Sequence, residues 1–146
     1  DLLYLACQNG FIFKINTSTK KIINFINQHE NGVNSICLEV NNENILYSGG
    51  KDALLKAFDI SLNQTIKIIP AHNYAIYDII QLNESTLVSC SRDKTIKVWD
   101  KKTMTIISRL DFKSEGHIHS VNNIIKYKKD MFFSCSDDGT IILWKC

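Results

Sequence analysis

The chain has 146 residues, of which 45% are hydrophobic and 22% are charged, and its formal net charge is +2. This composition is typical of one globular β-rich domain, and the charge is too small to imply a nucleic-acid or membrane partner by itself. No stretch approaches the roughly 18 consecutive apolar residues of a membrane helix, and the first residues do not resemble a signal peptide. Because the chain starts inside the apolar run Leu2–Leu5 without an initiator Met, we expect a segment of a longer protein.

Short apolar runs rich in Ile, Val, Leu and aromatic residues alternate with turn residues along the chain. Such runs predict β-strands, and no window keeps a helical period for the roughly 12 residues that a helix needs. The predicted strands cover residues 2–7, 11–16, 20–26, 33–40, 44–48, 53–59, 64–69, 76–81, 85–90, 94–100, 104–110, 120–127, 130–135 and 140–145. The sequence therefore predicts an all-β fold.

One pattern recurs three times across these strands. A serine is followed four residues later by an aspartate, and six residues after that by an aromatic residue. The three copies are Ser48, Asp52 and Phe58; Ser89, Asp93 and Trp99; and Ser134, Asp138 and Trp144. A fainter copy has Asn9 in the turn, and the four turn residues lie 43, 41 and 45 positions apart. A fixed period of this length marks a repeat architecture.

The turns share one physical logic. Asn9-Gly10 and Asp138-Gly139 supply the positive φ angles that tight hairpins require. Asp52 and Asp93 stand in the same place without a glycine, where the carboxylate can accept backbone N–H bonds and hold the turn. Four antiparallel strands in each unit of about 43 residues predict a propeller blade.

The chain resembles the WD-repeat (tryptophan–aspartate repeat) β-propellers over essentially its whole length. The resemblance rests on the strand endings Val98-Trp99-Asp100 and Leu143-Trp144, on the turn aspartates, and on a histidine before each unit. It implies about three and a half four-stranded blades, which is part of a ring. Expected boundaries are 1–27 for outer strands of a blade, 28–70 and 71–115 for whole blades, and 116–146 for inner strands of a last blade.

In that family the histidine, serine, aspartate and tryptophan form a buried hydrogen-bond network inside each blade. Carried over, the network residues are His29, Ser48 and Asp52; His72, Ser89, Asp93 and Trp99; and His117, Ser134, Asp138 and Trp144. Phe58 replaces the tryptophan of the second unit and removes its indole donor. The first unit keeps only Asn9, so we expect its blade to be the least rigid.

Serine, histidine and aspartate are also the residue types of a hydrolase triad. A catalytic site is needed once, whereas this set recurs at matched spacing and no Gly-x-Ser-x-Gly elbow surrounds any serine. We therefore predict a protein that is not an enzyme and has no cofactor. His117 and His119 form a weak metal candidate, but His117 is assigned to the network. The five cysteines contain no C-x-x-C pair, so a zinc site is not expected. Cys90 and Cys135 hold equivalent repeat positions and are expected to be unbonded, small buried side chains in a reducing compartment.

The resemblance places the residue before each turn aspartate, and the loop after each histidine, on one face of the disc. The predicted partner-binding residues are Gln8, Lys51, Tyr74, Arg92, Asp137, Ile118 and His119. Glu30, Asn31 and Asn73 belong to the same loops, and residues 111–116 lengthen the last inter-blade loop into a second candidate contact. Each of these residues could equally be part of a solvated rim.

We predict a non-enzymatic scaffold that presents this face to other proteins or peptides, in an intracellular location that is cytoplasmic or nuclear. The missing blades would come from the same chain or from a second copy. The alternative is a reader of a modified peptide or nucleic acid through the same face, centred on Arg92 and Tyr74. Nucleic acid is disfavoured, because the cluster Lys126–Lys129 fits a solvated strand end better than a phosphate-binding patch. Trp99-Asp100-Lys101-Lys102 fits only the permissive form of a motif that docks on cullin-type ubiquitin ligases.

Overall fold

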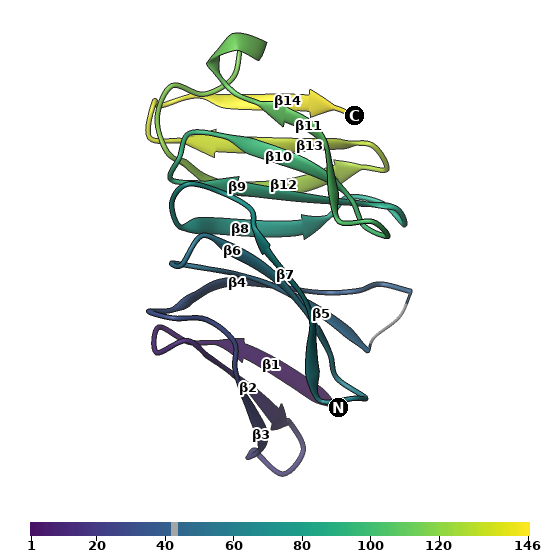
Figure 1. Ribbon diagram of the computed structural model, residues 1–146. Helices are drawn as coiled ribbons and strands as arrows, with labels where there is room; N and C mark the ends of the chain where they lie inside the picture. The colour runs from purple at the N-terminus through teal and green to yellow at the C-terminus, as the bar shows by residue number, and fades with distance from the viewer. Residues whose placement is uncertain (42–43) are drawn as a thin grey trace.

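The structure, a computed structural model, describes residues 1–41 and 44–146, and its described part is built of β-strands joined by short turns (Figure 1). The predicted all-β fold is confirmed, because the strands form four antiparallel sheets. In the described residues the one helical element is a single 3-10 turn, η1 (Phe112–Ser114). The strands are β1 (Leu2–Ala6), β2 (Phe11–Asn16), β3 (Lys21–Asn27), β4 (Val33–Leu38), β5 (Ile45–Gly50), β6 (Leu54–Asp59), β7 (Gln64–Pro70), β8 (Ile76–Gln81), β9 (Thr86–Ser91), β10 (Ile96–Asp100), β11 (Thr105–Leu110), β12 (Val121–Lys128), β13 (Met131–Ser136) and β14 (Ile141–Lys145).

Each sheet is an up-and-down meander of strands that follow one another in sequence. The strand orders are β1-β2-β3, β4-β5-β6-β7, β8-β9-β10-β11 and β12-β13-β14. We call these sheets blades 1 to 4. They stack in chain order, from the purple N-terminal blade to the yellow C-terminal one in Figure 1. This arrangement is a part of a β-propeller ring.

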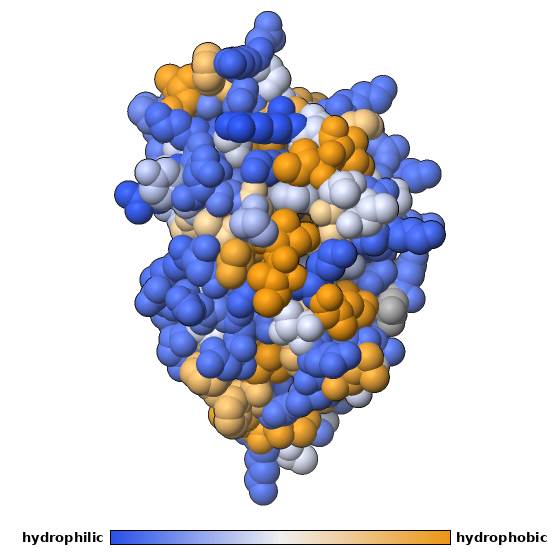
Figure 2. All heavy atoms as spheres, in the orientation of Figure 1, coloured by the Kyte–Doolittle hydropathy of each residue, from blue (hydrophilic) through white to orange (hydrophobic). Residues whose placement is uncertain are grey.

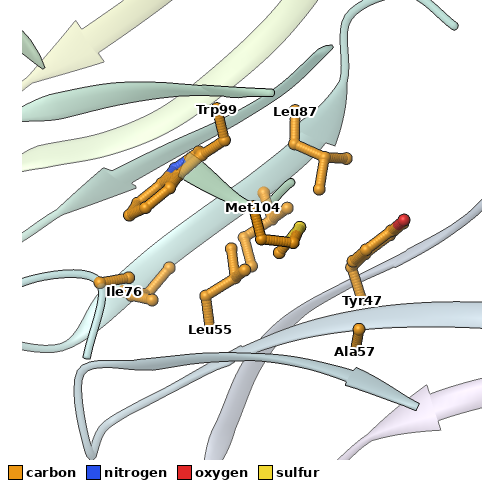
Figure 3. Packing of buried hydrophobic residues seen from close by; sticks show 9 residues of the cluster. Tyr47, Leu55, Ala57, Ile76, Leu87, Trp99 and Met104 are labelled. Carbon is orange, nitrogen blue, oxygen red and sulfur yellow. The ribbon is translucent and has the colours of Figure 1, made fainter. Parts of the chain in front are cut away.

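The hydrophobic core lies between neighbouring blades rather than inside one sheet. Figure 3 shows the contact between blades 2 and 3, where side chains from the two sheets face one another. Blade 2 supplies Tyr47, Leu55 and Ala57, and blade 3 supplies Ile76, Leu87, Trp99 and Met104. Burying one aliphatic side chain of this size contributes about 1.5–3 kcal/mol. Neighbouring blades therefore stabilise each other.

Two similar clusters fill the other blade contacts. Ile12 and Ile26 of blade 1 meet Val33, Leu46 and Phe58 of blade 2. Val88, Cys90 and Val98 of blade 3 meet Val121, Ile124 and Phe132 of blade 4. All five cysteines are free thiols. Cys90 is buried as expected, but Cys135 is only half-buried, because it pairs with the exposed Ile141 on the open face of blade 4.

One carboxylate connects the inner strands of three blades. Asp78 of β8 accepts a hydrogen bond from the Ser35 hydroxyl of β4 at 2.7 Å. Its other oxygen accepts bonds from Asn123 Nδ2 at 2.9 Å and from the backbone N–H of Ile124 at 3.2 Å, both in β12. Burial raises the pKa of Asp78, although these hydrogen bonds oppose the shift. Ser35, Asp78 and Asn123 hold equivalent positions in their blades, so the three side chains fix how neighbouring blades meet.

Blades 1 and 4 each leave an apolar sheet face open. Strand pairing places Leu3 opposite Ile15 and Leu5 opposite Phe13 on one face of blade 1. In blade 4, Ile125 pairs with Phe133 and Cys135 pairs with Ile141. Large exposed side chains on these two blades include Leu3, Leu5, Phe25, Ile125, Tyr127, Ile141 and Leu143. Figure 2 shows several hydrophobic patches separated by hydrophilic side chains in this view.

Candidate functional site

In blade 3 the predicted network residues lie in hydrogen-bonding contact. His72 stands in the loop before β8, Ser89 on β9, Asp93 in the β9–β10 turn and Trp99 on β10. His72 Nδ1 lies 3.0 Å from Asp93 Oδ2, and His72 Nε2 lies 2.8 Å from Ser89 Oγ. Trp99 Nε1 donates to the same Ser89 oxygen at 2.9 Å. One line of contacts thus runs from the indole of β10 to the carboxylate of the turn.

Every donor in this line of contacts meets an acceptor when the imidazole proton of His72 is on Nδ1. His72 then donates to Asp93, Ser89 donates to Nε2, and Trp99 donates to Ser89. Burial lowers the pKa of His72, against the opposing effect of Asp93. Burial also acts to raise the pKa of Asp93, but hydrogen bonds from His72, Thr95 and the Asn73 N–H outweigh it and hold that pKa well below its ordinary value. The network therefore contains an ionised carboxylate and a histidine that resists protonation.

Blade 4 repeats this geometry. His117 Nε2 lies 2.7 Å from Ser134 Oγ, and His117 Nδ1 lies 3.0 Å from Asp138 Oδ2. Trp144 Nε1 donates to Ser134 Oγ at 2.8 Å. Burial opposes ionisation of Asp138, yet hydrogen bonds from Thr140, the Ile118 N–H and His117 hold its pKa well below the ordinary value.

Blade 2 has the same arrangement without an indole. His29 Nε2 lies 2.8 Å from Ser48 Oγ. His29 Nδ1 contacts both oxygens of Asp52, at 2.8 and 3.1 Å. Phe58 is buried among apolar side chains at the place of the tryptophan and offers no donor to Ser48.

Sequence reasoning missed a threonine in two of the networks. Thr95 Oγ1 donates to Asp93 Oδ1 at 2.6 Å, and Thr140 Oγ1 donates to Asp138 Oδ1 at 2.6 Å. Each threonine stands two residues after the turn aspartate, where blade 2 has Leu54. The signal was an Asp-x-Thr pair that recurs at the blade period.

The order carboxylate, imidazole and serine hydroxyl is that of a hydrolase triad, but the serines are closed to a substrate. Ser48 and Ser89 are 0% exposed and Ser134 is 1% exposed. In blades 3 and 4 the serine oxygen also accepts the indole N–H, as described above. A nucleophile must reach the reacting carbonyl carbon, and these oxygens face the blade interior. The arrangement supports structure rather than acyl transfer.

Three of the predicted partner-binding residues surround one hollow on the face that carries the β5–β6 and β9–β10 turns. We call it the Tyr74 hollow; it has a volume of about 390 Å³. Its lining includes Lys51, Asn73, Tyr74 and Arg92. The Arg92 guanidinium lies over the Tyr74 ring, 5.8 Å from its centroid. Tyr74 is 60% exposed, so most of its surface is available to a partner.

A second hollow lies on the other side of the β9–β10 turn, between blades 3 and 4. We call it the Phe112 hollow; it has a volume of about 430 Å³ and is lined by Lys94, Arg109, Phe112 and Ile118 together with network residues. Ile118 was predicted as a partner-binding residue. Phe112 belongs to the 111–116 loop, which was predicted as a second candidate contact, whereas Lys94 was not predicted. The apolar side chains of Phe112 and Ile118 are both well exposed.

The remaining predicted surface residues lie in neither hollow. Gln8, Asp137 and His119 are exposed. The Asp137 carboxylate accepts a hydrogen bond from Asn122 Nδ2 at 2.6 Å. Glu30 and Asn31 are also exposed, and the backbone N–H of Glu30 donates to Asp52. The structure thus brings together Lys51, Tyr74 and Arg92, and places Ile118 in a separate site.

At the opposite ends of the strands, three lysines line a hollow of about 820 Å³. They are Lys126, Lys128 and Lys129, and the lining also includes Asn83 and Asp130. Asp130 accepts a hydrogen bond from Asn83 Nδ2 at 2.8 Å. In the possible cullin-docking motif, Lys101 forms a 2.6 Å ion pair with Glu39, whereas Lys102 is exposed.

Over 1–41 and 44–146, no three His, Cys, Asp or Glu side chains are grouped to hold a metal ion. Within the same ranges, none of the helical structure has the length and hydropathy needed to cross a bilayer.

Comparison with known proteins identifies the repeats. The family model described as "WD domain, G-beta repeat" matches residues 20–59, 63–100 and 107–145. Each matched segment begins with the outer strand of one blade and continues through the first three strands of the next. The sequence repeat and the structural blade are therefore offset by one strand.

Curated relatives share these repeats over part of their length. The chain is 36% identical over 87 residues to a DDB1- and CUL4-associated factor 11 homolog of Caenorhabditis briggsae, a match that covers 56% of this chain and 16% of the relative. It is 41% identical over 61 residues to a WD repeat-containing protein 89 homolog of Dictyostelium discoideum, which covers 41% of this chain and 17% of the relative. The chain thus spans about one sixth of the length of these relatives.

A solved structure has the same fold. The structure of U3-55K superimposes with a TM-score of 0.88 at 19% sequence identity, covering 99% of this chain and 45% of that one. At this identity the similarity concerns the fold alone.

Proposed function

Because this chain belongs to the WD-repeat family of β-propellers, we propose that it is a non-enzymatic scaffold that binds protein partners through the face around the Tyr74 hollow. The observation that carries the proposal is the exposed Arg92–Tyr74 pair beside Lys51 at this hollow. Arginine and tyrosine are the residues that most often anchor protein interfaces.

The backbone around this pair is held in place before any partner arrives. The Ser91 hydroxyl donates to the Tyr74 carbonyl at 3.1 Å, and the Arg92 N–H donates to the Ala75 carbonyl at 3.0 Å. The next residue, Asp93, is anchored in the buried network. Because these loops are already ordered, binding loses little conformational entropy there, which favours affinity.

The alternative function is a reader of a modified peptide or nucleic acid through the same face, including a substrate-receptor role on a cullin-type ubiquitin ligase. Relatives named as DDB1- and CUL4-associated factor 11 homologs favour the ligase role. Within Trp99–Lys102, however, Trp99 is buried and Lys101 is paired with Glu39, so Lys102 alone is exposed for docking. We therefore place the protein scaffold first.

We further propose that the open apolar faces of blades 1 and 4 are covered by further blades of the same protein. Contiguous exposed apolar surface of this kind usually marks a contact site. A second copy of this half-ring is the other candidate for covering these faces.

The scaffold is tested by reversing charge at the Tyr74 hollow. The double variant Lys51→Glu with Arg92→Glu should lose at least half of the proteins co-purified with the unmodified protein, measured by quantitative mass spectrometry. The matched control is Lys126→Glu with Lys129→Glu, which makes the same charge change at the opposite ends of the strands. Both doubles should keep the parent melting temperature, because all four side chains are exposed.

Unchanged protein partners in the Lys51/Arg92 double variant would contradict the scaffold proposal. A nuclease treatment before purification removes partners that are bound through nucleic acid, and so distinguishes the scaffold from the reader. Loss only of nucleic acid, or of one modified peptide, would support the reader.

A further inference from the structure

We propose that the partner segment is an acidic, extended peptide that crosses the β9–β10 turn and places a large apolar side chain in the Phe112 hollow. This inference rests on the proposed function, because it specifies the partner chemistry of the same face. Its basis is the position of the two hollows, one on each side of the turn.

The two hollows share the β9–β10 turn as their common wall. Arg92 lines the Tyr74 hollow, whereas Asp93, Lys94 and Thr95 line the Phe112 hollow. Residues two apart in an extended chain are about 7 Å from one another. A peptide that crosses this turn passes both hollows, and its side chains two to four residues apart span about 7–14 Å.

The charge around the hollows selects an acidic partner. Their lining contains four cationic side chains, Lys51, Arg92, Lys94 and Arg109, and three carboxylates, Asp52, Asp93 and Asp111. Each of these carboxylates already accepts hydrogen bonds within the protein, from His29, from Thr95 and from the Lys113 N–H, respectively. Arg109 is paired with Asp111 at 3.3 Å.

The other three cations have no such partner. Among the ion pairs of residues 1–41 and 44–146, none includes Lys51, Arg92 or Lys94. Unpaired positive charge beside a hollow attracts carboxylates and disfavours basic segments. A partner peptide with two or more acidic residues complements this surface.

The apolar wall of the Phe112 hollow is large and rigidly presented. Phe112 is 65% exposed and Ile118 is 59% exposed. Asp111 caps η1: its carboxylate accepts the Lys113 N–H at 2.9 Å, and its own N–H donates to Ser114 Oγ at 2.9 Å. The loop then closes through the Gly116 N–H, which donates to the Asp111 carbonyl at 2.9 Å.

Gly116 is required for this closure. A Cβ atom at this position would lie 2.6 Å from the Asp111 carbonyl oxygen. The loop therefore holds in place the backbone that carries the exposed Phe112 ring. Because this backbone is already ordered, binding loses little loop entropy here, which favours Phe112 as an interface anchor.

The test uses the full-length protein and synthetic peptides that carry a fluorescent label, with binding measured by anisotropy. The parent probe has a Ser/Gly background with two Glu residues and one Leu placed two, three or four positions away. Three comparison probes lack the Leu, lack the Glu residues, or carry Lys in place of Glu. The best parent probe should bind at least about tenfold more tightly than any comparison probe, which corresponds to about 1.4 kcal/mol.

Two variants assign the parts of the peptide to the two hollows. Phe112→Ala should weaken the Leu-containing probe about tenfold and leave the Leu-free acidic probe unchanged, whereas Arg92→Glu should weaken both. Leu62→Ala is the matched control, because Leu62 is an exposed apolar residue in the β6–β7 turn and lines neither hollow. Melting temperatures of all three variants should equal that of the parent.

Several results would overturn the inference. They are equal binding of Leu-containing and Leu-free probes, no effect of Phe112→Ala, or no binding of the parent probes at about 1 mM. Tighter binding of a single-stranded RNA of equal charge would replace the acidic peptide by nucleic acid. If Lys51→Glu with Arg92→Glu removes protein partners but Phe112→Ala does not, the scaffold stands and this inference fails; if neither variant removes them, both fail.

Discussion

Blades 2 and 3 hold the same three side chains in the same order but support them differently. In blade 3, Trp99 and Thr95 add an indole donor to the serine and a hydroxyl donor to the aspartate. In blade 2 these positions are Phe58 and Leu54, and the histidine instead contacts both carboxylate oxygens. The histidine, serine and aspartate thus form the shared unit, and the other donors are additions to it.

A backbone difference accompanies these two solutions. Gly50 ends β5, and a Cβ atom there would lie 2.5 Å from His29 Nδ1 and 2.7 Å from Asp52 Oδ1. Blade 3 has Ser91 at the equivalent position, where the hydroxyl donates to the Tyr74 carbonyl. The absence of a side chain lets His29 and Asp52 occupy this space in blade 2, whereas in blade 3 the side chain orders the loop of the interaction face.

The largest expected loss of stability comes from replacing the turn aspartate, and it should differ between blades 3 and 2. Asp93→Ala leaves His72, Thr95 and the Asn73 N–H without their acceptor, and each stranded buried group costs about 1–3 kcal/mol. We expect a loss of about 3 kcal/mol or more in the free energy of unfolding, measured by denaturant titration. Asp52→Ala should cost less, because blade 2 has no threonine donor to strand.

Arg92→Ala is the control for this substitution, because Arg92 is exposed beside Asp93 and lies outside the network. It should change the free energy of unfolding by no more than about 0.5 kcal/mol. Equal melting temperatures for Asp93→Ala and Arg92→Ala would refute the network.

The next largest effect comes from giving blade 3 the phenylalanine that blade 2 has at this position. Trp99→Phe removes the indole N–H that donates to Ser89 Oγ. Because Trp99 is only 2% exposed, the smaller ring also leaves a cavity in the core. We expect a loss of about 1–3 kcal/mol in the free energy of unfolding. Trp144→Phe in blade 4 removes the same bond from a half-buried residue and should cost less. Equal losses at the two sites would show that burial does not set the cost.

The smallest expected effect is a dependence on pH that both blades share. Burial lowers the pKa of His29 and of His72 below the ordinary value of 6.5, despite the nearby aspartates. The unfolded chain therefore binds more protons than the folded one as the pH falls below about 6.5. The contribution of the two neutral histidines to the free energy of unfolding is thus complete above about pH 6.5 and declines below it. Thermal melting between pH 8 and pH 5 should show a lower melting temperature on the acid side.

Asp93 does not interfere with this test, whereas burial raises the pKa of Asp78 and gives a contribution of opposite sign as the pH falls, so the measurement is repeated in the Asp78→Asn variant. The pKa of Asp93 is held far below its ordinary value, so its contribution is complete above about pH 5 and declines progressively as the pH falls further through about 4. Stability that stays constant or rises between about pH 7 and pH 5.5 would contradict a histidine held neutral by burial.

Much of the fold could be predicted from the sequence, because the turn chemistry and the strand pattern recur. The strand predicted over 64–69 is observed as Gln64–Pro70, and the strand predicted over 140–145 is observed as Ile141–Lys145. The spacing of His72, Ser89 and Asp93 could be compared with two other copies, so it indicated which residues belong together. Repetition supplied the evidence that a single pattern lacks.

The features that escaped prediction are those that differ from blade to blade. Ser35, Asp78 and Asn123 hold equivalent positions but are three different residue types, so no pattern marks their contact. Residues 111–116 were predicted as a candidate contact because they lengthen the last inter-blade loop, but the 3-10 turn capped by Asp111 and the hollow beside Phe112 have no counterpart in the repeat. Which residues line a hollow depends on how two blades meet, and that relation lies outside the repeat itself.

The contact at Asp78 limits how freely the blades could be exchanged. Blades 2, 3 and 4 meet there as donor, acceptor and donor, so blade 3 is matched to the two blades that flank it. A tandem copy of blade 3 would set one Asp78 against another, and two carboxylates that share one site repel each other. Blades with the same strand topology are therefore not interchangeable, because the side chains on their inner strands must pair. An engineered rearrangement must keep a donor next to an acceptor at this position.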